Sequence, residues 1–366
     1  MLRSKPPFRA DHVGSLLRPA ALKEAREKRA KGEISAVDLA AIEDREIERV
    51  IRKQEEVGLN SVTDGEFRRS WWHLDFLWGL DGIERYVMDH GIAFAGVQTR
   101  REGARVTGKV GFSNHPMLAH YKFLASHTKR TPKFTIPAPS AMYGRTGREA
   151  VSEKVYPDLD AFFADLGAAY RKAVRAFANA GCRYLQLDEV FIAMLCDPNY
   201  RKTQAGHGDD PQRLAELYGD LINTAISKIP PDMTVTMHMC RGNYRSTFMG
   251  TGGYDPVADV LFDRIKVHGY FMEYDSDRAG SFEPLRRVHK GQIVVLGLVT
   301  TKTGQLEGKD TLKRRIEEAA KYVDANQLCL SPQCGFASTE EGNVLAEAEQ
   351  WAKLARIVEV ANEVWD

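Results

Sequence analysis

The feature that most constrains the fold of this chain is an order, repeated along its length, of short apolar runs and longer helical patterns. Each run ends in polar or turn-forming residues, as parallel strands buried on both faces do. The eight runs are Phe8–Gly14, Leu59–Thr63, Lys133–Pro137, Arg183–Leu187, Thr234–Met237, Tyr270–Met272, Ile293–Leu296 and Gln327–Leu330.

Helical periodicity fills most of the intervals between these runs. The clearest examples are Leu159–Ala180, Pro211–Ile229, Asp310–Val323 and Glu340–Trp365. Pro211 suits the first turn of a helix, and Asp310 suits an N-cap. Strand and helix that alternate eight times predict an α/β fold, the closed parallel TIM-type (β/α)8 barrel.

One interval, about residues 71–130 after the second run, is too long for a single crossover helix. Within residues 91–112 the stretches GIAFAGVQT and GARVTGKVGF predict a hairpin or a small excursion. Trp71 and Trp72 fit either an aromatic wall for a heterocycle or the packing of a lid against the barrel. Residues 1–366 are therefore expected to form one barrel domain that carries this insertion as a lid or binding element.

Charge balance and cysteine number narrow the class of protein. Lys and Arg number 51 against 50 Asp and Glu, so we expect neither nucleic acid nor an anionic membrane as a partner. The sequence has no apolar run of about 18 residues and no signal-peptide pattern. Five cysteines in so long a chain predict reduced thiols and a cytoplasmic location. A homo-oligomer is compatible with the sequence, which does not decide the oligomeric state.

Metal-binding residues follow the predicted strands, where barrel enzymes place their active sites. His238 and Cys240 form a His-x-Cys pair whose side chains share one face of an extended segment. Cys334, in SPQCGF, follows another strand, and Glu273 follows a strand between those two. Two thiolates, one imidazole and one carboxylate suit tetrahedral zinc. The alternatives are packed core residues and, for Glu273, an ordinary carboxylate at a strand end.

Two carboxylates, Asp188 and Glu189, follow the fourth run. Either is a candidate to bind a substrate ammonium group or to act as a general base, and either is equally a candidate to cap the next helix. The remaining cysteines, Cys182, Cys196 and Cys329, are expected to pack as small apolar side chains.

The sequence resembles the cobalamin-independent methionine synthase family, and most closely its short, single-barrel members. The segments that carry the resemblance occur in the family's order over nearly the whole chain: ADHVGSLLRP, TDGEFRR, LQLDE, HMC, EYD and SPQCGF. The resemblance implies a catalytic zinc ion. It also implies transfer of a methyl group from 5-methyltetrahydrofolate, or its polyglutamate, to the thiol of homocysteine, which gives methionine.

Site residues follow from the resemblance position by position. The implied zinc ligands are His238, Cys240, Glu273 and Cys334, and the implied amino-acid ligands are Ser15 in VGS, Glu66 in DGEF and Asp188 in LDE. The chemistry agrees, because an ammonium group buried in a barrel mouth needs anionic partners and a carboxylate needs donors. A free thiol has a pKa of about 8.5, and coordination to zinc deprotonates it. Asp188 is thus predicted to take part in catalysis as well as in binding.

Two departures from the larger family members concern the methyl donor. Those enzymes carry an additional N-terminal half barrel, and a histidine after the seventh strand that is proposed as the proton donor. Here Lys302 occupies the place of the histidine and is predicted to be the catalytic acid, or else to neutralise nearby carboxylates or contact the donor's glutamate tail.

The alternative function is a related zinc-thiolate alkyl transferase that uses a sulfonium, methyl-corrinoid or epoxide donor. A non-catalytic zinc protein is disfavoured, because structural zinc ligands usually lie close together in the sequence.

Overall fold

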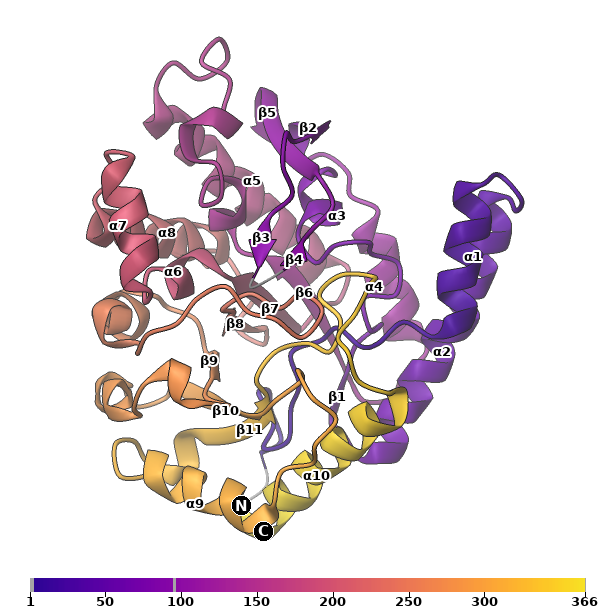
Figure 1. Ribbon diagram of the computed structural model, residues 1–366, viewed down its shortest axis with the longest axis vertical. Coiled ribbons are helices and arrows are strands. Elements are labelled where there is room, and N and C mark those ends of the chain that lie inside the picture. The colour runs from indigo at the N-terminus through magenta and orange to yellow at the C-terminus, as the bar shows by residue number, and fades with distance from the viewer. Residues whose placement is uncertain (1–2, 95–96, 366) are drawn as a thin grey trace.

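A computed structural model describes residues 3–94 and 97–365, so Met1, Leu2, Asp366 and two residues of the predicted hairpin, Ala95 and Gly96, lie outside the described residues. At its centre a curled parallel sheet is surrounded by helices (Figure 1). In their order around the sheet, its strands are β1 (Ser61–Val62), β6 (Thr131–Pro137), β7 (Tyr184–Glu189), β8 (Thr234–Met239), β9 (Gly269–Glu273), β10 (Ile293–Val299) and β11 (Leu328–Pro332).

The extended N-terminal segment lies between β11 and β1 and occupies the eighth position of the barrel. Ala10 forms a parallel bridge with Leu330 in β11. On the other side, the Thr63 hydroxyl donates to the Gly14 carbonyl at 2.6 Å. The predicted α/β barrel is therefore confirmed. Its first strand is a bridged segment and not a regular strand, because side chains replace part of the backbone ladder.

Helices cover the outside of this sheet (Figure 1). They include α1 (Ala20–Ala30), α2 (Ala36–Val57), α5 (Leu159–Asn179), α6 (Phe191–Met194), α7 (Pro198–Gly206), α8 (Pro211–Ile226), α9 (Lys309–Ala319) and α10 (Glu347–Trp365). Pro211 lies in the first turn of α8, as predicted. No helix in residues 3–94 or 97–365 is long and apolar enough to cross a bilayer.

Two helix starts differ from the prediction. Asp310 is not an N-cap: it lies in the first turn of α9, and Gly308 is the cap residue. The predicted helix from Glu340 begins only at Glu347, because the preceding residues form a loop at the barrel mouth. In that loop the Asn343 amide donates to the Asn243 side chain at 2.9 Å and to the Thr301 carbonyl at 2.8 Å. Helical periodicity does not report such long-range contacts.

The strands extend further at their carboxyl ends than the apolar runs predicted. β7, β8 and β9 include Asp188, His238 and Glu273, respectively, near or at their last residue. The parallel register pairs Asp188 with His238, and Gly297 of β10 with Glu273. Backbone pairing thus continues through these polar residues and holds their side chains at defined positions on the barrel rim.

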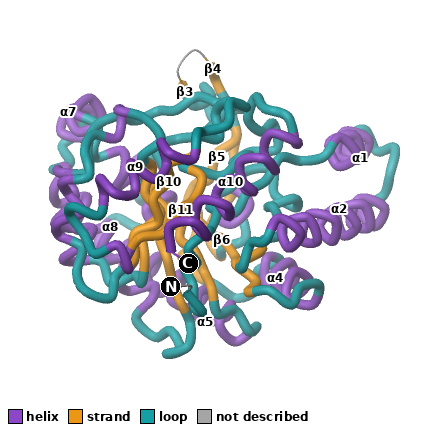
Figure 2. Tube along the Cα trace, turned by 90° about the horizontal axis from the view of Figure 1, so that it is seen from below, coloured by secondary structure: helices purple, strands orange, loops and turns teal. Residues whose placement is uncertain are grey.

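The insertion between β1 and β6 forms its own small substructure. Its elements are α3 (Leu74–Leu77), β2 (Asp81–Val87), β3 (Ala93–Phe94), β4 (Val97–Gln98), β5 (Glu102–Gly111) and α4 (Met117–Ser126). β2 pairs antiparallel with β5, and the β3–β4 hairpin lies beyond one end of the barrel (Figure 2). A hairpin is thus present within residues 91–112 as β3–β4, whereas the second stretch, β5, pairs with β2, which lies outside that range.

A buried ion pair lies inside the barrel. Lys133 Nζ lies 3.2 Å from Asp11 Oδ1, and both side chains are 0% exposed. The same carboxylate accepts hydrogen bonds from the Tyr184 hydroxyl at 2.8 Å and the Ser61 hydroxyl at 2.9 Å. Burial lowers the pKa of Lys133, and the charge of Asp11 opposes that shift. One carboxylate therefore connects the N-terminal segment to β1, β6 and β7.

We predict that Lys133→Met lowers the free energy of unfolding by about 3–5 kcal/mol, because it leaves the Asp11 carboxylate buried without its cation. Urea denaturation followed by circular dichroism measures this. Lys313→Met removes a lysine from a surface ion pair with Glu363 and is expected to change stability little. Equal effects of the two substitutions would contradict a structural role for the buried pair.

Candidate metal centre

Four side chains meet at the carboxyl end of the barrel. His238 and Glu273 lie in β8 and β9, Cys240 directly follows β8, and Cys334 follows β11. Their candidate ligand atoms all lie within 4.8 Å of one another, and all four residues are buried. The four residues predicted as zinc ligands are thus brought together by the fold, and their role as ligands stays a prediction.

The geometry of this cluster fits zinc. The sulfur atoms of Cys240 and Cys334 are 3.7 Å apart. Two sulfurs bound to one tetrahedral zinc at about 2.3 Å would be about 3.8 Å apart, whereas a disulfide would require about 2.05 Å. His238 is 1% exposed, and neither ring nitrogen bonds to a nitrogen or oxygen of the described residues. A buried imidazole without such partners is costly, and a metal ion would satisfy it.

The cluster favours an anionic sulfur. Donation from the Cys240 thiol holds the pKa of Cys334 well below its ordinary value, against the opposing effect of burial, and the charge of His238 adds to the lowering. The Cys240 pKa is raised well above its ordinary value, first by its hydrogen bond to Cys334 and then by burial. The pair therefore favours a thiolate at Cys334 and a thiol at Cys240. The thiolate is the form of cysteine that binds a metal.

The carboxylate of Glu273 is oriented by its neighbours. Its Oε1 accepts from the Arg241 backbone N–H at 3.0 Å, and its Oε2 accepts from the Arg278 guanidinium at 2.7 Å. The Tyr254 hydroxyl accepts from the Glu273 backbone N–H at 3.0 Å. Sequence reasoning missed Arg278 and Tyr254. The short spacing between Glu273 and Arg278 could have indicated their contact. No sequence pattern indicated the contact with Tyr254, which lies well before β9 in the chain.

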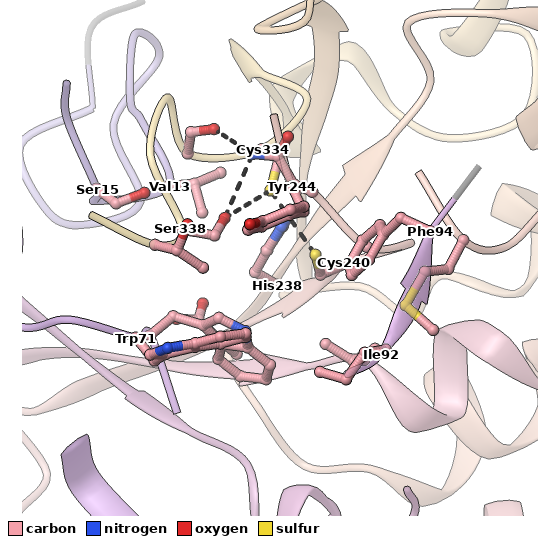
Figure 3. Close-up of a pocket in the computed structure, with 18 of the residues that line it drawn as sticks. Val13, Ser15, Trp71, Ile92, Phe94, His238, Cys240, Tyr244, Cys334 and Ser338 are labelled. Atoms are coloured by element: carbon pink, nitrogen blue, oxygen red, sulfur yellow. Dashed lines mark hydrogen bonds between the residues drawn. The ribbon is translucent and has the colours of Figure 1, made fainter. Parts of the chain in front are cut away.

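Three residues of the cluster, His238, Cys240 and Cys334, line a pocket at this end of the barrel (Figure 3). Val13 and Ser15 lie on one side of Cys334, while Trp71 and Phe94 come from the insertion and form other parts of the wall. Trp72 also lines the pocket. Trp71 is 2% exposed and lines the pocket, which agrees with packing against the barrel, and its contact with a heterocycle stays a prediction.

The insertion is hydrogen-bonded to the loop that follows Cys334. Trp71 forms an antiparallel bridge with Thr339, and the Trp72 backbone N–H donates to the Ser338 carbonyl at 2.9 Å. Arg100 adds an ion pair with Glu340 at 2.9 Å. These contacts hold the aromatic wall against the rim that carries one of the candidate ligands.

Two of the predicted substrate residues, Glu66 and Ser15, have unusual local geometry at the pocket. Glu66 has a left-handed φ of 61°, a conformation that is strained for a non-glycine residue. Its Oε1 accepts from the Thr135 hydroxyl at 2.7 Å, whereas its Oε2 is buried without a hydrogen-bond partner in the described residues. Ser15 Oγ lies so close to Gly335 that an added Cβ there would be 1.9 Å away. Gly335 therefore allows the approach of Ser15 to the pocket.

The two adjacent carboxylates after the fourth run have different surroundings. Asp188 lines the pocket, its Oδ1 accepts from the Gln186 amide at 2.7 Å, and burial raises its pKa to about 7. Glu189 is directed away from the pocket: its Oε1 accepts from the Phe191 and Ile192 backbone N–H groups at the start of α6. Of the alternatives left open by the sequence, Glu189 is thus the capping residue.

Lys302 lies behind the pocket wall. Its ammonium donates to the Asn243 side chain at 3.4 Å, and Asn243 lines the pocket. Lys302 itself does not line the pocket, although its charge adds to the lowering of the Cys334 pKa and opposes the rise that burial gives the pKa of Glu273. Its predicted role as catalytic acid stays a prediction.

Comparison with known proteins places the chain in a family. Residues 8–363 match the model of the cobalamin-independent synthase catalytic domain. The chain belongs to the cobalamin-independent methionine synthase family. Two uncharacterized Bacillus subtilis relatives, YxjG and YxjH, are 52% and 50% identical, each over 99% of this chain and 96% of its own length. A Listeria monocytogenes structure, solved as a candidate vitamin-B12-independent methionine synthase, is 41% identical with a TM-score of 0.79 and covers 100% of both chains.

We predict that the purified protein binds about one zinc ion per chain. Cys240→Ser and Cys334→Ser should each lose most of the metal, because each removes a thiolate ligand. Cys182→Ser and Cys329→Ser are the controls, since both cysteines are buried away from the cluster. Zinc content is measured by plasma emission spectrometry, and full retention of zinc by Cys334→Ser would overturn this ligand set.

Proposed function

We propose that this protein transfers a methyl group from 5-methyltetrahydrofolate, or its polyglutamate, to the thiol of homocysteine and so forms methionine. One zinc ion would be held by His238, Cys240, Glu273 and Cys334. The observation that carries this proposal is the spacing of the two sulfurs beside a buried imidazole that has no nitrogen or oxygen partner in the described residues, in a pocket that also offers two carboxylates. Membership of the cobalamin-independent methionine synthase family supports methyl transfer to homocysteine.

Different pocket residues would bind the ammonium group and the carboxylate of the amino acid. The free Oε2 of Glu66 and the carboxylate of Asp188 would bind the ammonium group, and their charges interact with each other. Such a pair is stabilised when a cation lies between its members. The Ser15 hydroxyl is a donor for the substrate carboxylate. Zinc, when bound, lowers the pKa of a thiol so that its sulfur is nucleophilic at neutral pH.

The methyl donor is expected to bind against the aromatic wall of the insertion. As the sulfur electron pair forms the new S–C bond, the N–C bond of the donor breaks and its nitrogen takes up a proton. That nitrogen is a poor leaving group without an acid. Lys302, which donates to the pocket residue Asn243 at 3.4 Å, would supply this proton. We also propose that the reaction takes place in the cytoplasm, because the five cysteines are free thiols.

Asp188→Asn is expected to weaken homocysteine binding by about 1–3 kcal/mol, the usual size of one charge-assisted contact. Isothermal titration of the zinc-loaded protein measures the affinity. A thiol of similar length without the amino group serves as the control ligand and should be nearly indifferent to the substitution. Equal losses for the two thiols would mean that Asp188 does not bind an ammonium group.

Lys302→Met is expected to reduce turnover with 5-methyltetrahydrofolate by about 10²–10⁴-fold, since general acid catalysis contributes that much. Reaction with a methylsulfonium donor should be spared, because its leaving group needs no proton. Methionine formation is measured by chromatography for both donors. If the unmodified protein uses sulfonium or methyl-corrinoid donors and never 5-methyltetrahydrofolate, the folate assignment fails, and an alkyl transferase with another donor takes its place.

A further inference from the structure

Arg145 is a pocket residue to which the sequence and the proposed reaction assign no role. It lies in the loop between two 3-10 turns, η1 (Pro139–Met142) and η2 (Gly147–Ala150), after β6. It lines the main pocket together with His238 and Cys240. It also lines a second, smaller pocket, whose walls include Tyr86 of β2 and Gly103 of β5. The guanidinium therefore stands where the insertion meets the metal-centre pocket.

The charge of Arg145 is not compensated by the protein. Within residues 3–94 and 97–365 it takes part in no hydrogen bond and no ion pair. Burial lowers its pKa to about 10, and the groups that act in the opposite direction are the phenols of Tyr86 and Tyr200. Neither pocket carboxylate forms an ion pair with Arg145 in the described residues: Glu66 Oε1 lies 3.5 Å from Arg69, and Asp188 accepts from Gln186. The Arg145 side chain is partly exposed, and a guanidinium that lines a pocket without a protein counter-ion is available to bind an anionic group of a ligand.

A second polar group lies beside Arg145 without a partner. His73 is 2% exposed, and its Nδ1 has no hydrogen-bond partner in the part of the chain that the structure describes. Burial, and then the charge of Arg145, lower the pKa of His73 well below its ordinary value, so the imidazole is neutral. His73 lines the smaller cavity with Arg145, and its ring lies 4.5 Å from that of Trp72.

We propose that Arg145, with His73 beside it, binds an acidic group of the methyl donor, either a carboxylate or a phosphate. A guanidinium suits such a group because it donates two parallel hydrogen bonds to two oxygens. The position of Arg145 favours binding of the methyl donor over binding of the thiol acceptor. Arg145 follows β6 and faces the insertion, whereas Ser15 follows the N-terminal segment and contacts Gly335 beyond β11.

This inference rests on the proposed methyl transfer and restricts its donor. An uncompensated cation on the wall disfavours a simple sulfonium ion that has no acidic group, and it gives no contact to a neutral epoxide. A folate with its glutamate carboxylates and a corrinoid with its phosphate both satisfy the site. The shared chemistry is an oxyanion, and the experiment below separates its sources.

The test compares Arg145→Met and Arg145→Lys with the unmodified protein. Arg148→Met, in the same loop, is the matched control: its guanidinium donates to the Tyr156 carbonyl at 2.7 Å and lines neither cavity. Binding of 5-methyltetrahydrofolate is followed by quenching of tryptophan fluorescence, since Trp71 and Trp72 line the pocket. We expect Arg145→Met to weaken binding about tenfold or more and Arg145→Lys to weaken it less. The control should stay within about twofold, and zinc content should be unchanged in all variants.

Homocysteine distinguishes the acceptor from the donor. Its affinity should be unchanged in Arg145→Met. If it falls while the affinity of 3-aminopropane-1-thiol, which lacks the carboxylate, does not, Arg145 binds the acceptor and the donor assignment is overturned. If neither the folate nor homocysteine responds to Arg145→Met, the proposal is also overturned.

A failure of the proposed function is recognised separately. If the unmodified protein does not bind 5-methyltetrahydrofolate, the folate donor is wrong, and Arg145 is tested with inorganic phosphate. Phosphate should then raise the melting temperature above that in sodium chloride of equal ionic strength, and Arg145→Met should remove the gain. The same phosphate effect in both proteins, or none in either, would refute an anion site at Arg145.

Discussion

The Asp11 carboxylate inside the barrel is the contact on which the rest of this structure depends. Through Lys133, Tyr184 and Ser61 it joins the N-terminal segment to three strands, where a regular backbone ladder is incomplete. Because that segment closes the barrel between β1 and β11, the residues after it emerge at the rim beside Cys334. The N-terminal segment therefore both closes the barrel and brings Ser15 to the pocket. Loss of the Asp11–Lys133 ion pair is expected to affect barrel closure and the pocket together.

Charge is separated within the pocket above the metal centre. Carboxylates line one part of the wall, sulfur and imidazole form the base, and the uncompensated guanidinium of Arg145 faces the insertion. Within the described residues Arg145 forms no ion pair, so its partly exposed guanidinium is available to bind the oxyanion of a ligand. The proposed reaction needs such a division, because the cationic end of an amino acid and the acidic part of a methyl donor must approach one sulfur together.

The insertion contributes to this division because it is held against the rim. The Trp71–Thr339 bridge and the Arg100–Glu340 ion pair connect it to the loop after β11, far away in the sequence. Its tryptophans thereby become part of the pocket wall, and the cavity is narrowed around the candidate ligands. Exclusion of water from such a cavity strengthens every polar contact made inside it.

The sequence by itself determined the barrel and the candidate ligands His238, Cys240, Glu273 and Cys334. Buried parallel strands are nearly continuous apolar runs, and a barrel places whatever follows each run on one rim, so strand order alone predicted their convergence. Only the tertiary structure decided that Glu189 caps a helix, that Lys302 stands behind Asn243, and that Arg145 has no counter-charge. Those outcomes depend on which side chains of distant segments meet in space, and no local pattern of residues records that.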